Sequence, residues 1–344
     1  MTPGAFRVGI TGDLLDSRGE PSFGRAPRAA LDAAPGLESE WLPAAIREIT
    51  AEHACSFDAL YVNTPRVPAA AVAADGLRLK LVARHGVGYD SVDVAAMTRA
   101  GVLVANTPDA VARPVACAAL ALVLALAHRL LIKDRLVRSG RWAERTDHMG
   151  TGLSGRTLGV IGAGRIGSEL LRLARPFDLE LLACDPYADE RRLAALGAHR
   201  VPLDALLERS DFVVLCCPLT EQTRHLIDDR ELALMKPTAF LVNVARGPVV
   251  DETALYRALA ERRIAGAGLD VFEEEPARPD NPILALDSVI VAPHALAWTD
   301  ELFGAIARSA IAAVLAVHAR RRPQYLVNPE ALSHPRVRAW LRDG

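Results

Sequence analysis

The most constraining feature of this chain is a glycine-rich turn that joins two stretches of different periodicity. An apolar run over residues 157–161 ends in G-A-G-R-I-G at residues 162–167, and a helical pattern follows. A second apolar run then stops at Asp185, roughly 20 residues beyond the turn. This order predicts a strand, a tight turn and a helix that together bind a dinucleotide.

Each part of the motif has a physical reason. Gly162 allows the tight turn, Gly164 lets the backbone approach a pyrophosphate, and Gly167 lets the helix pack closely on the strand. The helix N-terminus offers unpaired N–H groups and a positive dipole end to the phosphates. Asp185 is placed to bind a ribose diol, and its charge would repel a 2′-phosphate, so the motif favours NAD over NADP.

Length and composition indicate an ordinary globular protein. A chain of 344 residues favours two domains, and a hydrophobic content of 51% with 24% charged residues is typical of chains that bury a large core. The net charge of −2 gives no bulk attraction to nucleic acid or membranes. The longest apolar run, residues 115–127, is shorter than the ~20 residues that cross a bilayer. We therefore expect no nucleic-acid or membrane partner.

The cysteines form no recognisable metal or redox motif. They are scattered, and no C-x-x-C pair occurs among Cys55, Cys117, Cys184, Cys216 and Cys217. We therefore expect buried free thiols, a reducing cytosol and no bound metal. The chain opens with a strand-like F-R-V-G-I rather than a secretory signal, which also favours a cytoplasmic protein.

Apolar strand-like runs alternate with helical patterns along nearly the whole chain. This alternation predicts an α/β fold with parallel sheets covered by helices on both faces. The runs are too many for one small sheet, so we predict two doubly wound lobes. The predicted strands are residues 7–11, 59–63, 79–84, 102–105, 157–161, 179–184, 212–216, 239–243, 267–270 and 289–292.

Two long helices are expected to shape the domain organisation. The sequence T-P-D at residues 107–109 is a helix-start signal, and the segment 109–139 is a candidate bridge and dimer surface. The segment 299–320 has helical periodicity and is expected to return the chain to the first lobe. Because the dinucleotide motif lies in mid-chain, the first hundred residues must form something other than the nucleotide-binding domain.

Three ionisable residues follow predicted strands, where ligands bind in open α/β sheets. They are Arg246, Glu275 and His294. Hydride transfer to a ketone needs these residue types. An imidazolium can protonate the oxygen, a carboxylate favours that charged form, and a guanidinium can bind a neighbouring carboxylate. Each residue also has an ordinary structural interpretation. Arg246 would be a surface charge, Glu275 part of a solvated acidic run, and His294 a hydrogen-bonded structural histidine. The spacing of the three in the sequence does not by itself show that they meet.

Longer motifs carry a family resemblance over nearly the whole chain. They are R-H-G-V-G-Y-D-S-V-D (84–93), the glycine-rich turn, C-P-L-T-E-Q-T-R-H-L-I (217–227), L-V-N-V-A-R-G-P-V-V-D-E-T-A-L (241–255), G-L-D-V-F-E-E-E-P (268–276) and A-P-H (292–294). In these motifs the chain resembles the D-isomer-specific 2-hydroxyacid dehydrogenases. The resemblance implies that Arg246, Glu275 and His294 are the catalytic set, and that backbone amides of Val87 and Gly88 bind the substrate carboxylate.

The resemblance also implies an architecture and a cofactor. Residues 1–108 and 297–344 would form a discontinuous, flavodoxin-like substrate domain, and residues 109–296 a Rossmann-type dinucleotide-binding domain through which a homodimer forms. Arg246 would also bind substrate. The expected NAD contacts are Gly162, Gly164, Arg165, Ile166, Gly167, Asp185, Pro218, Thr223, Ala245 and Asp270.

The chain departs from the family pattern at two places. Cys117 replaces a common glutamate near the start of the long helix, and Leu296 and Trp298 are large for the segment after the catalytic histidine. These two side chains either crowd or line the substrate pocket, or simply pack at the hinge, and packing is the favoured interpretation. We predict an NAD-dependent enzyme that interconverts small 2-keto acids and D-2-hydroxy acids. The alternatives are a non-catalytic NAD-sensing corepressor-like scaffold, or a formate- or phosphite-type dehydrogenase on the same fold.

Overall fold

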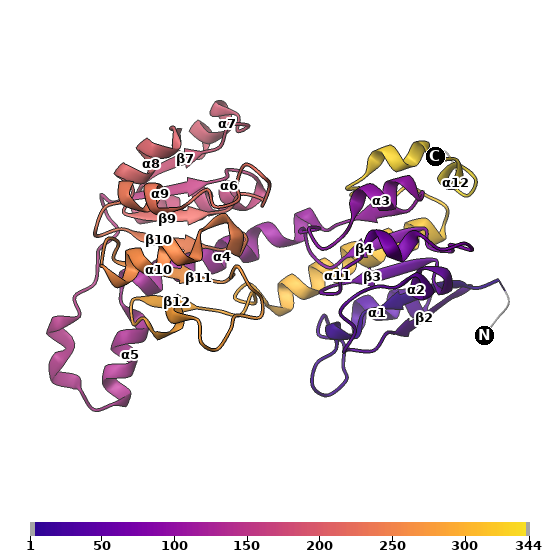
Figure 1. Ribbon diagram of the computed structural model, residues 1–344, viewed down its shortest axis with the longest axis horizontal. Coiled ribbons are helices and arrows are strands. Elements are labelled where there is room, and N and C mark those ends of the chain that lie inside the picture. Colours follow the sequence, from indigo (N-terminus) through magenta and orange to yellow (C-terminus); the bar gives the residue numbers. More distant parts are fainter. Residues whose placement is uncertain (1–3, 342–344) are drawn as a thin grey trace. The chain divides into compact units, whose positions relative to one another are not determined.

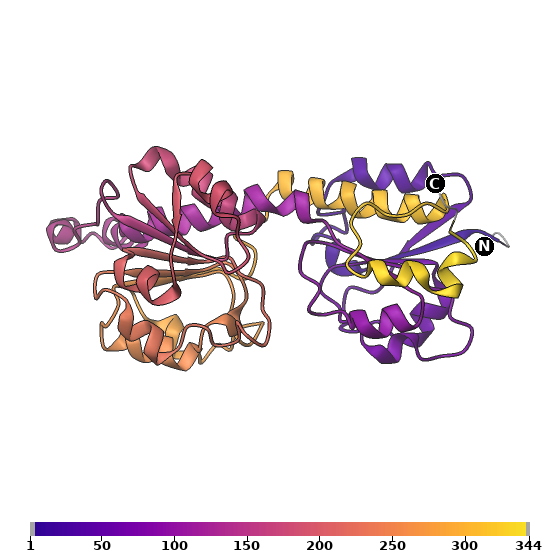
Figure 2. The ribbon, with the colours of Figure 1, turned by 90° about the horizontal axis from the view of Figure 1, so that it is seen from above.

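The computed structural model describes residues 4–341 and divides into two compact units. Both ends of the chain form the first unit, which comprises the residues up to Val111 and those from Trp298 onward. The second unit is Ala112–Ala297. Each unit is a parallel sheet with helices on both faces (Figures 1 and 2), which is the predicted two-lobe α/β architecture.

The first unit has a five-stranded sheet in the order β2-β1-β3-β4-β5, and every strand pair is parallel. This order is that of flavodoxin-like folds. The strands are β1 Phe6–Ile10, β2 Leu37–Trp41, β3 Ala59–Val62, β4 Leu81–Arg84 and β5 Leu103–Ala105. The helices are α1 Arg25–Asp32, α2 Ala51–Ser56, α3 Val94–Arg99, α11 Asp300–His318 and α12 Pro335–Arg338.

The C-terminal segment is fixed to this sheet by buried polar contacts. Asn328 is fully buried, accepts a hydrogen bond from the amide of Val104 at 2.8 Å and donates to the carbonyl of Val102 at 3.0 Å. Arg336 donates to the carbonyl of Leu79 at 2.6 Å. These contacts satisfy backbone groups beside β5 and β4, so the two chain ends form one unit.

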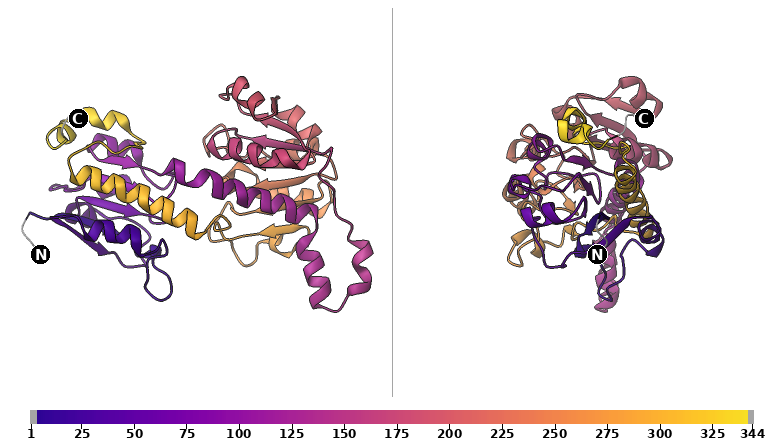
Figure 3. Two further views of the ribbon diagram at one scale, coloured as in Figure 1. Left: turned by 180° about the vertical axis from the view of Figure 1, so that it is seen from behind. Right: turned by 90° about the vertical axis from the view of Figure 1, so that its right-hand side faces the viewer.

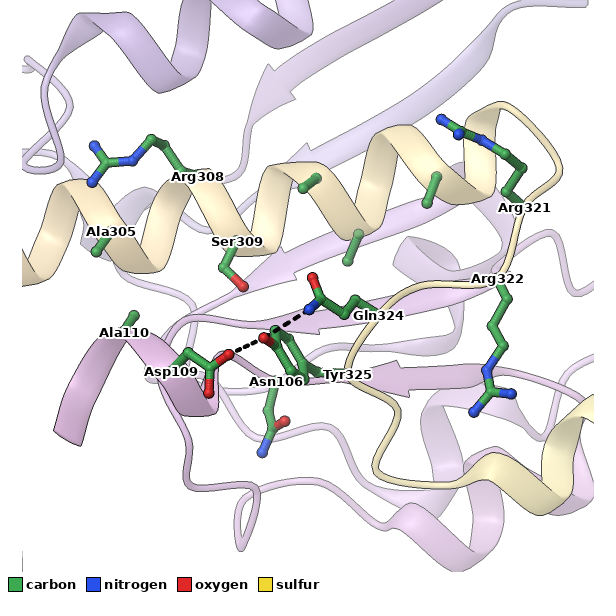
Figure 4. A pocket seen from close by; sticks show the side chains of 13 residues that line it. Asn106, Asp109, Ala110, Ala305, Arg308, Ser309, Arg321, Arg322, Gln324 and Tyr325 are labelled. Carbon is green, nitrogen blue, oxygen red and sulfur yellow. Dashed lines mark hydrogen bonds between the residues drawn. The ribbon is translucent and has the colours of Figure 1, made fainter. Parts of the chain in front are cut away.

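A cavity of about 590 Å³ lies between α11, the segment that follows it and the first residues of α4 (Pro108–Ala127). The Tyr325 hydroxyl accepts a hydrogen bond from Gln324 at 2.9 Å and donates to Asp109 (Figure 4). The guanidinium groups of Arg308, Arg321 and Arg322 point in different directions around the rim (Figure 4). The cavity therefore presents no converging set of charges, and its polar centre ties the start of α4 to the C-terminal segment.

The second unit has a seven-stranded parallel sheet in the order β12-β11-β10-β9-β6-β7-β8. Counted from β6, this is the Rossmann order 3-2-1-4-5-6 with one further strand. The strands are β6 Thr157–Ile161, β7 Glu180–Cys184, β8 Ala198–Arg200, β9 Phe212–Leu215, β10 Phe240–Asn243, β11 Gly266–Leu269 and β12 Val289–Val291. The further helices are α5 Leu130–Arg138, α6 Arg165–Ala174, α7 Glu190–Ala195, α8 Leu203–Arg209, α9 Asp229–Leu234 and α10 Glu252–Ala260.

Two strands have no counterpart in the sequence-based prediction. They are β2 and β8, which lie at edges of the two sheets. The residues of β2 are only half-buried or exposed, and two of the three residues of β8 are exposed. Because these strands are not buried on both faces, they lack the continuous apolar run by which the other strands were predicted.

The predicted single helix over residues 109–139 is wrong, because the chain forms two helices there. α4 ends at Ala127, and Arg129 adopts a left-handed φ of 52° before α5 begins. A left-handed residue cannot continue a right-handed helix, so the chain turns at this point. α5 and η3 (Trp142–Asp147) then form an arm, residues 128–150, that projects from the second unit (Figure 3).

Both long helices, α4 and α11, are long and apolar enough by composition to cross a membrane. The length of the apolar run therefore does not exclude a membrane-spanning helix, contrary to the sequence-based expectation. Burial of these helices against their sheets distinguishes the two possibilities instead. Leu122 of α4 packs so closely on β11 that a Cβ added to Gly268 would lie 3.2 Å from the Leu122 Cβ. In α11, Phe303, Ile306 and eight other residues are buried. Both helices are thus core helices of their units.

The cysteine prediction is only partly right. All five cysteines are free thiols, but only Cys217 is buried and Cys117 is exposed. Cys117 lies within α4, and apolar neighbours in the sequence of a helix do not imply that every residue between them is buried. Among residues 4–341, no group of three or more histidine, cysteine or acidic residues could hold a metal ion.

A buried tyrosine–histidine pair lies at the carboxyl edge of the first sheet. Tyr61 is fully buried in β3, and its hydroxyl lies 2.5 Å from Nδ1 of His85, which directly follows β4. Burial lowers the pKa of His85 to about 3, and the charge of Arg84 adds to this effect. His85 is therefore neutral at physiological pH.

Because His85 is buried in its neutral form beside Tyr61, we expect the folded protein to lose stability in acid. In the unfolded chain the His85 imidazole binds a proton near pH 6.5, whereas in the folded chain it does so only near pH 3. The stability that the neutral, buried His85 contributes is therefore fully present above pH 6.5 and is lost as the pH falls below that value. Between pH 7 and 5 the wild type should lose about 2 kcal/mol more unfolding free energy than His85→Gln, which keeps an acceptor for Tyr61. Urea titrations followed by tryptophan emission measure this, and equal losses in both proteins would contradict it.

Candidate active site

The glycine-rich turn joins β6 to α6, and each glycine meets a different constraint. Gly162 has a φ of +90°, and a Cβ there would lie 2.5 Å from the Cys217 amide nitrogen. A Cβ on Gly167 would lie 2.1 Å from the Gly162 carbonyl oxygen, so α6 can pack on β6 only with glycine. A Cβ on Gly164 would meet no atom within 4 Å, which leaves open space for a phosphate at the start of α6.

Asp185 follows β7 and closes the turn from the other side. One carboxylate oxygen accepts from the amide of Ala163 and the other from the amide of Tyr187, each at 2.8 Å. The side chain is thus oriented by two backbone contacts and is only half-buried. The open space at Gly164, the exposed start of α6 and this oriented carboxylate fit a dinucleotide whose ribose diol reaches Asp185.

The other predicted cofactor residues follow neighbouring strands of the same sheet. Thr223 donates through its hydroxyl to the carbonyl of Pro218 at 2.7 Å and accepts from the amide of Thr220 at 2.7 Å, which closes the loop after β9. Because all seven strands are parallel, their carboxyl ends share one edge. The predicted residues at this edge are Gly162, Gly164, Arg165, Ile166, Gly167, Asp185, Pro218, Thr223, Ala245 and Asp270.

Arg246 is held by a buried asparagine that the sequence analysis did not single out. Asn243 ends β10, accepts from the amide of Ala245 at 3.0 Å and donates to the carbonyl of Arg246 at 3.0 Å. These two hydrogen bonds of the Asn243 side chain hold the backbone in a compact turn, so that the residues after β10 leave the sheet. A buried polar residue at the end of an apolar strand was the signal that could have identified it.

The loops after β10 and β11 pass in direct contact at Gly247. A Cβ on Gly247 would lie only 1.8 Å from the Phe272 carbonyl oxygen. The φ of Gly247 is not positive, so the constraint is the close approach of two backbones rather than an unusual conformation. This contact sets Arg246 beside the loop that carries Glu275.

Glu275 and His294 form a directed pair. Oε2 of Glu275 lies 2.8 Å from Nδ1 of His294, and Oε1 accepts from the amide of Phe272 at 3.1 Å. His294 follows β12 and has a left-handed φ of 53°. The carboxylate binds the proton on Nδ1, so Nε2 is the nitrogen left to exchange a proton with a ligand.

The local charges keep Glu275 ionised. Burial raises the pKa of Glu275, but the hydrogen bond and charge of His294 and the charge of Arg246 outweigh this and lower the pKa overall. The three predicted catalytic side chains therefore influence one another electrostatically at the carboxyl edge of the sheet. About half of the His294 side chain is exposed, so it is open to a ligand.

Asp270, which the resemblance assigned to the nicotinamide, also has a structural partner. Its Oδ1 accepts from the amides of Ala295 and Leu296 at 3.0 and 3.1 Å. Burial raises the pKa of Asp270, although both hydrogen bonds act in the opposite direction. Asp270 therefore fixes the backbone immediately after His294, which helps to hold the left-handed turn.

A second histidine–glutamate pair supports the loop that carries Glu275. Nε2 of His225 contacts the carboxylate of Glu273, and the His225 amide donates to the carbonyl of Pro248 at 2.8 Å. The amide of Glu273 donates to Glu252 at 3.0 Å. These contacts link three loops at the sheet edge. No local sequence pattern predicts them, because the pairing joins residues far apart in the chain.

In the first unit, the loop that follows β4 has its carbonyls occupied and its amides free. Gly86 has a φ of +117°, which turns the peptide groups of the loop. No residue among 4–341 accepts from the amides of Val87 and Gly88, the predicted carboxylate ligands. The loop carbonyls are bound by Thr107 N to Gly86 O at 3.0 Å, Asn106 Nδ2 to Val87 O at 2.9 Å and Arg84 Nε to Gly88 O at 3.1 Å.

Comparison with known proteins identifies the family. A model of the D-isomer specific 2-hydroxyacid dehydrogenase NAD binding domain matches residues 120–295. The chain is 45% identical to a glyoxylate reductase from Korarchaeum cryptofilum (strain OPF8), over 74% of this chain and 78% of that protein. It is 42% identical to a glyoxylate reductase from Thermococcus onnurineus (strain NA1), over 83% and 87% of the two chains. The chain belongs to the D-isomer-specific 2-hydroxyacid dehydrogenase family.

The structure agrees with this assignment. It matches a glyoxylate reductase from Paecilomyes thermophila with a TM-score of 0.82 and 29% sequence identity, covering 96% of this chain and 99% of that one. The protein is thus an NAD-dependent D-2-hydroxyacid dehydrogenase, and NAD(H) is its cofactor.

The close contact at Gly247 predicts that a larger residue there lowers both the stability and the activity of this dehydrogenase. In Gly247→Ala the new methyl group meets a backbone carbonyl that cannot move alone, so the loops after β10 and β11 must separate. We expect a loss of about 1–3 kcal/mol in stability and about a hundredfold in kcat/KM, measured by thermal unfolding and NADH oxidation.

Gly152→Ala is the matched control for this variant. Gly152 has no atom within 4 Å of an added Cβ and no positive φ, so this substitution should change neither quantity. Full activity in Gly247→Ala would show that the close approach of the two loops does not position the site.

Proposed function

We propose that this dehydrogenase interconverts a small 2-keto acid and the D-2-hydroxy acid, with Arg246, Glu275 and His294 as its catalytic residues. The observation that supports this most strongly is the Glu275–His294 hydrogen bond, at the same sheet edge as the dinucleotide turn. NADH, when bound, supplies the hydride that reduces the keto carbon.

The proton comes from His294. As the keto carbon accepts hydride, negative charge builds on its oxygen, and Nε2 of the imidazolium donates a proton to it. Glu275 holds the Nδ1 proton and stabilises the imidazolium, as its lowered pKa keeps it charged. In the reverse direction Nε2 of His294 accepts the hydroxyl proton of the D-2-hydroxy acid.

Arg246 and the loop at Val87 and Gly88 hold the substrate. The guanidinium group binds the substrate carboxylate and polarises the keto oxygen beside it. The two free amides at Val87 and Gly88 are the carboxylate ligands that we propose for the first unit, since the carbonyls of this loop are already occupied within that unit. On this proposal the unit made of both chain ends is the substrate domain, and Ala112–Ala297 is the dinucleotide-binding domain.

The relatives guide the choice of substrate. The two curated relatives described above are named glyoxylate reductases, which favours a short 2-keto acid such as glyoxylate or hydroxypyruvate. A short acid also suits a site in which carboxylate, keto oxygen and reacting carbon are all bound directly.

We further propose a cytoplasmic homodimer that forms through the dinucleotide-binding domain. Five of the eleven exposed large hydrophobic side chains of the described residues lie on the arm, residues 128–150. Such a concentration of apolar surface is typical of protein interfaces. Five free thiols suit a reducing compartment. The five side chains on the arm are Leu130, Leu131, Val137, Trp142 and Met149.

Substrate turnover tests the proposed activity. The protein should oxidise NADH with glyoxylate, hydroxypyruvate or pyruvate, and Arg246→Ala should lower kcat/KM at least a thousandfold. That factor corresponds to about 4 kcal/mol for the loss of a charge-paired anchor. Arg246→Lys should recover only part of the activity, because an ammonium group cannot bind a carboxylate in bidentate fashion.

Two outcomes would contradict this proposal. One is a wild type that reduces no 2-keto acid in a broad panel with NADH. Formate and phosphite are assayed beside this panel with NAD, as alternative hydride donors. The other is an unchanged kcat/KM in Arg246→Ala. A thermal shift with NAD shows in each case that the variant is folded and binds its cofactor.

Asp185 is expected to set the cofactor preference. Asp185→Ser removes the charge that repels a 2′-phosphate and should lower the ratio of kcat/KM for NADH over NADPH by at least tenfold. Steady-state kinetics with both cofactors measure the ratio. A wild type that already prefers NADPH would show that Asp185 does not discriminate as proposed.

A further inference from the structure

Arg200 is a charged residue to which neither the motifs nor the proposed reaction give a role. It ends β8, which pairs in parallel with β7, and its partner in the register is Ala183. Residues paired in this way point to the same face of a sheet. Ala183 belongs to the core cluster that contains Leu170 and Leu171 of α6, so Arg200 leaves the sheet on the face that α6 covers.

Two observations bring the guanidinium group of Arg200 close to Asp185. Nη2 donates to the carbonyl of Pro186, the residue directly after Asp185, at 3.0 Å. The charge of Arg200 also reaches the thiol of Cys184, the residue directly before Asp185. Burial and the charge of Asp185 raise the pKa of this thiol, and Arg200 opposes the rise. The guanidinium group therefore lies near both chain neighbours of the carboxylate that is expected to bind a ribose.

Asp185 stands between the glycine-rich turn and Arg200. The strands β6, β7 and β8 are neighbours in this order, and they carry the turn, Asp185 and Arg200 at their carboxyl ends. The Asp185 carboxylate accepts from the amide of Ala163 in the turn, on the side where a pyrophosphate is expected. A ribose whose 5′ end faces this turn and whose diol faces Asp185 would have β8 as its outer neighbour.

The donors of Arg200 are only partly used. A guanidinium group carries five N–H donors, and the Pro186 carbonyl accepts one of them. Glu190 lies 3.6 Å from Nη1, but its side chain is 75% exposed, so water or another anion can replace this contact at little cost. The side chain of Arg200 is itself 35% exposed. Its planar N–H groups match the oxygens of a phosphate.

We propose that Arg200 is a specificity-determining residue for the cofactor, a ligand for a 2′-phosphate that the charge of Asp185 keeps from binding. The ligand class is an adenine nucleotide with a phosphate on its 2′-oxygen, such as NADP. In the wild type the carboxylate repels this phosphate and favours the diol of NAD. Once that charge is removed, the guanidinium group attracts the phosphate. The inference rests on the role proposed above for Asp185 but not on the identity of the substrate.

A purely structural role of Arg200 has different consequences. Its hydrogen bond to Pro186 helps to hold the loop that begins at Asp185. Loss of such support would weaken every adenine nucleotide alike, because each needs the same carboxylate and turn. Loss of a phosphate ligand would weaken only nucleotides that carry the 2′-phosphate. The difference between two matched nucleotides therefore measures the proposed role.

Binding of nucleotide fragments provides this test without turnover. Adenosine 2′,5′-bisphosphate carries the additional phosphate, and adenosine 5′-monophosphate lacks it. Asp185→Asn keeps a side-chain oxygen for a backbone donor but carries no charge. We expect this variant to bind the bisphosphate at least tenfold more tightly than the monophosphate, as measured by isothermal titration calorimetry. Adding Arg200→Gln should reduce the difference to within threefold, and Arg200→Lys should keep part of it.

Arg191→Gln is the matched control, because it removes the same charge from an exposed position of α7. In the Asp185→Asn background it should leave the difference between the two nucleotides within twofold. Kinetics extend the test to the protein with its native Asp185. There Arg200→Gln should lower kcat/KM with NADPH at least fivefold and leave kcat/KM with NADH within twofold.

Three results would overturn the assignment of Arg200. Equal binding of both nucleotides by Asp185→Asn and by Asp185→Ser would show that no phosphate ligand lies beside Asp185. An equal loss of both nucleotides on adding Arg200→Gln would show that the residue only supports the loop. An equal effect of Arg191→Gln would show a diffuse positive field instead. If no 2-keto acid is reduced but the bisphosphate is bound as expected, the proposed reaction fails while this assignment stands.

Discussion

The chemistry of this protein depends on how closely backbone segments can approach at the carboxyl edge of a parallel sheet. At Gly247 the loop after β10 touches the carbonyl of Phe272 in the loop after β11, and at Gly162 and Gly167 the turn of the dinucleotide motif is equally tight. Any side chain at these positions would push the loops apart. Glycine thus sets the spacing of Arg246, Glu275 and the phosphate-binding turn.

Around these contacts, polar side chains, two of them buried, orient the proposed reacting groups. Asn243 shapes the turn at Arg246, Asp270 holds the backbone after His294, and Glu275 fixes the Nδ1 proton of His294. Each pairs with a backbone or ring group that would otherwise lack a hydrogen-bond partner. The loop at Val87 and Gly88, which we propose binds substrate, has its carbonyls occupied and its amides available.

Ring contacts in the first unit run from Tyr61 through His85 and Phe303 to Trp298. The inner members of this row are buried and keep His85 neutral, while its outer member stays exposed.

The sequence alone determined the strand-turn-helix motif, ten of the twelve strands within residues 4–341 and the residue types of the proposed site, because continuous apolar runs and obligatory glycines are local signals. It missed the edge strands β2 and β8, whose exposed residues lack that signal, and the break at Arg129. Only the tertiary structure paired Glu275 with His294 and His225 with Glu273, and revealed the positioning roles of Asn243 and Asp270. Such contacts join distant segments, and only the folded sheet, by bringing its strand ends to one edge, decides which of them meet.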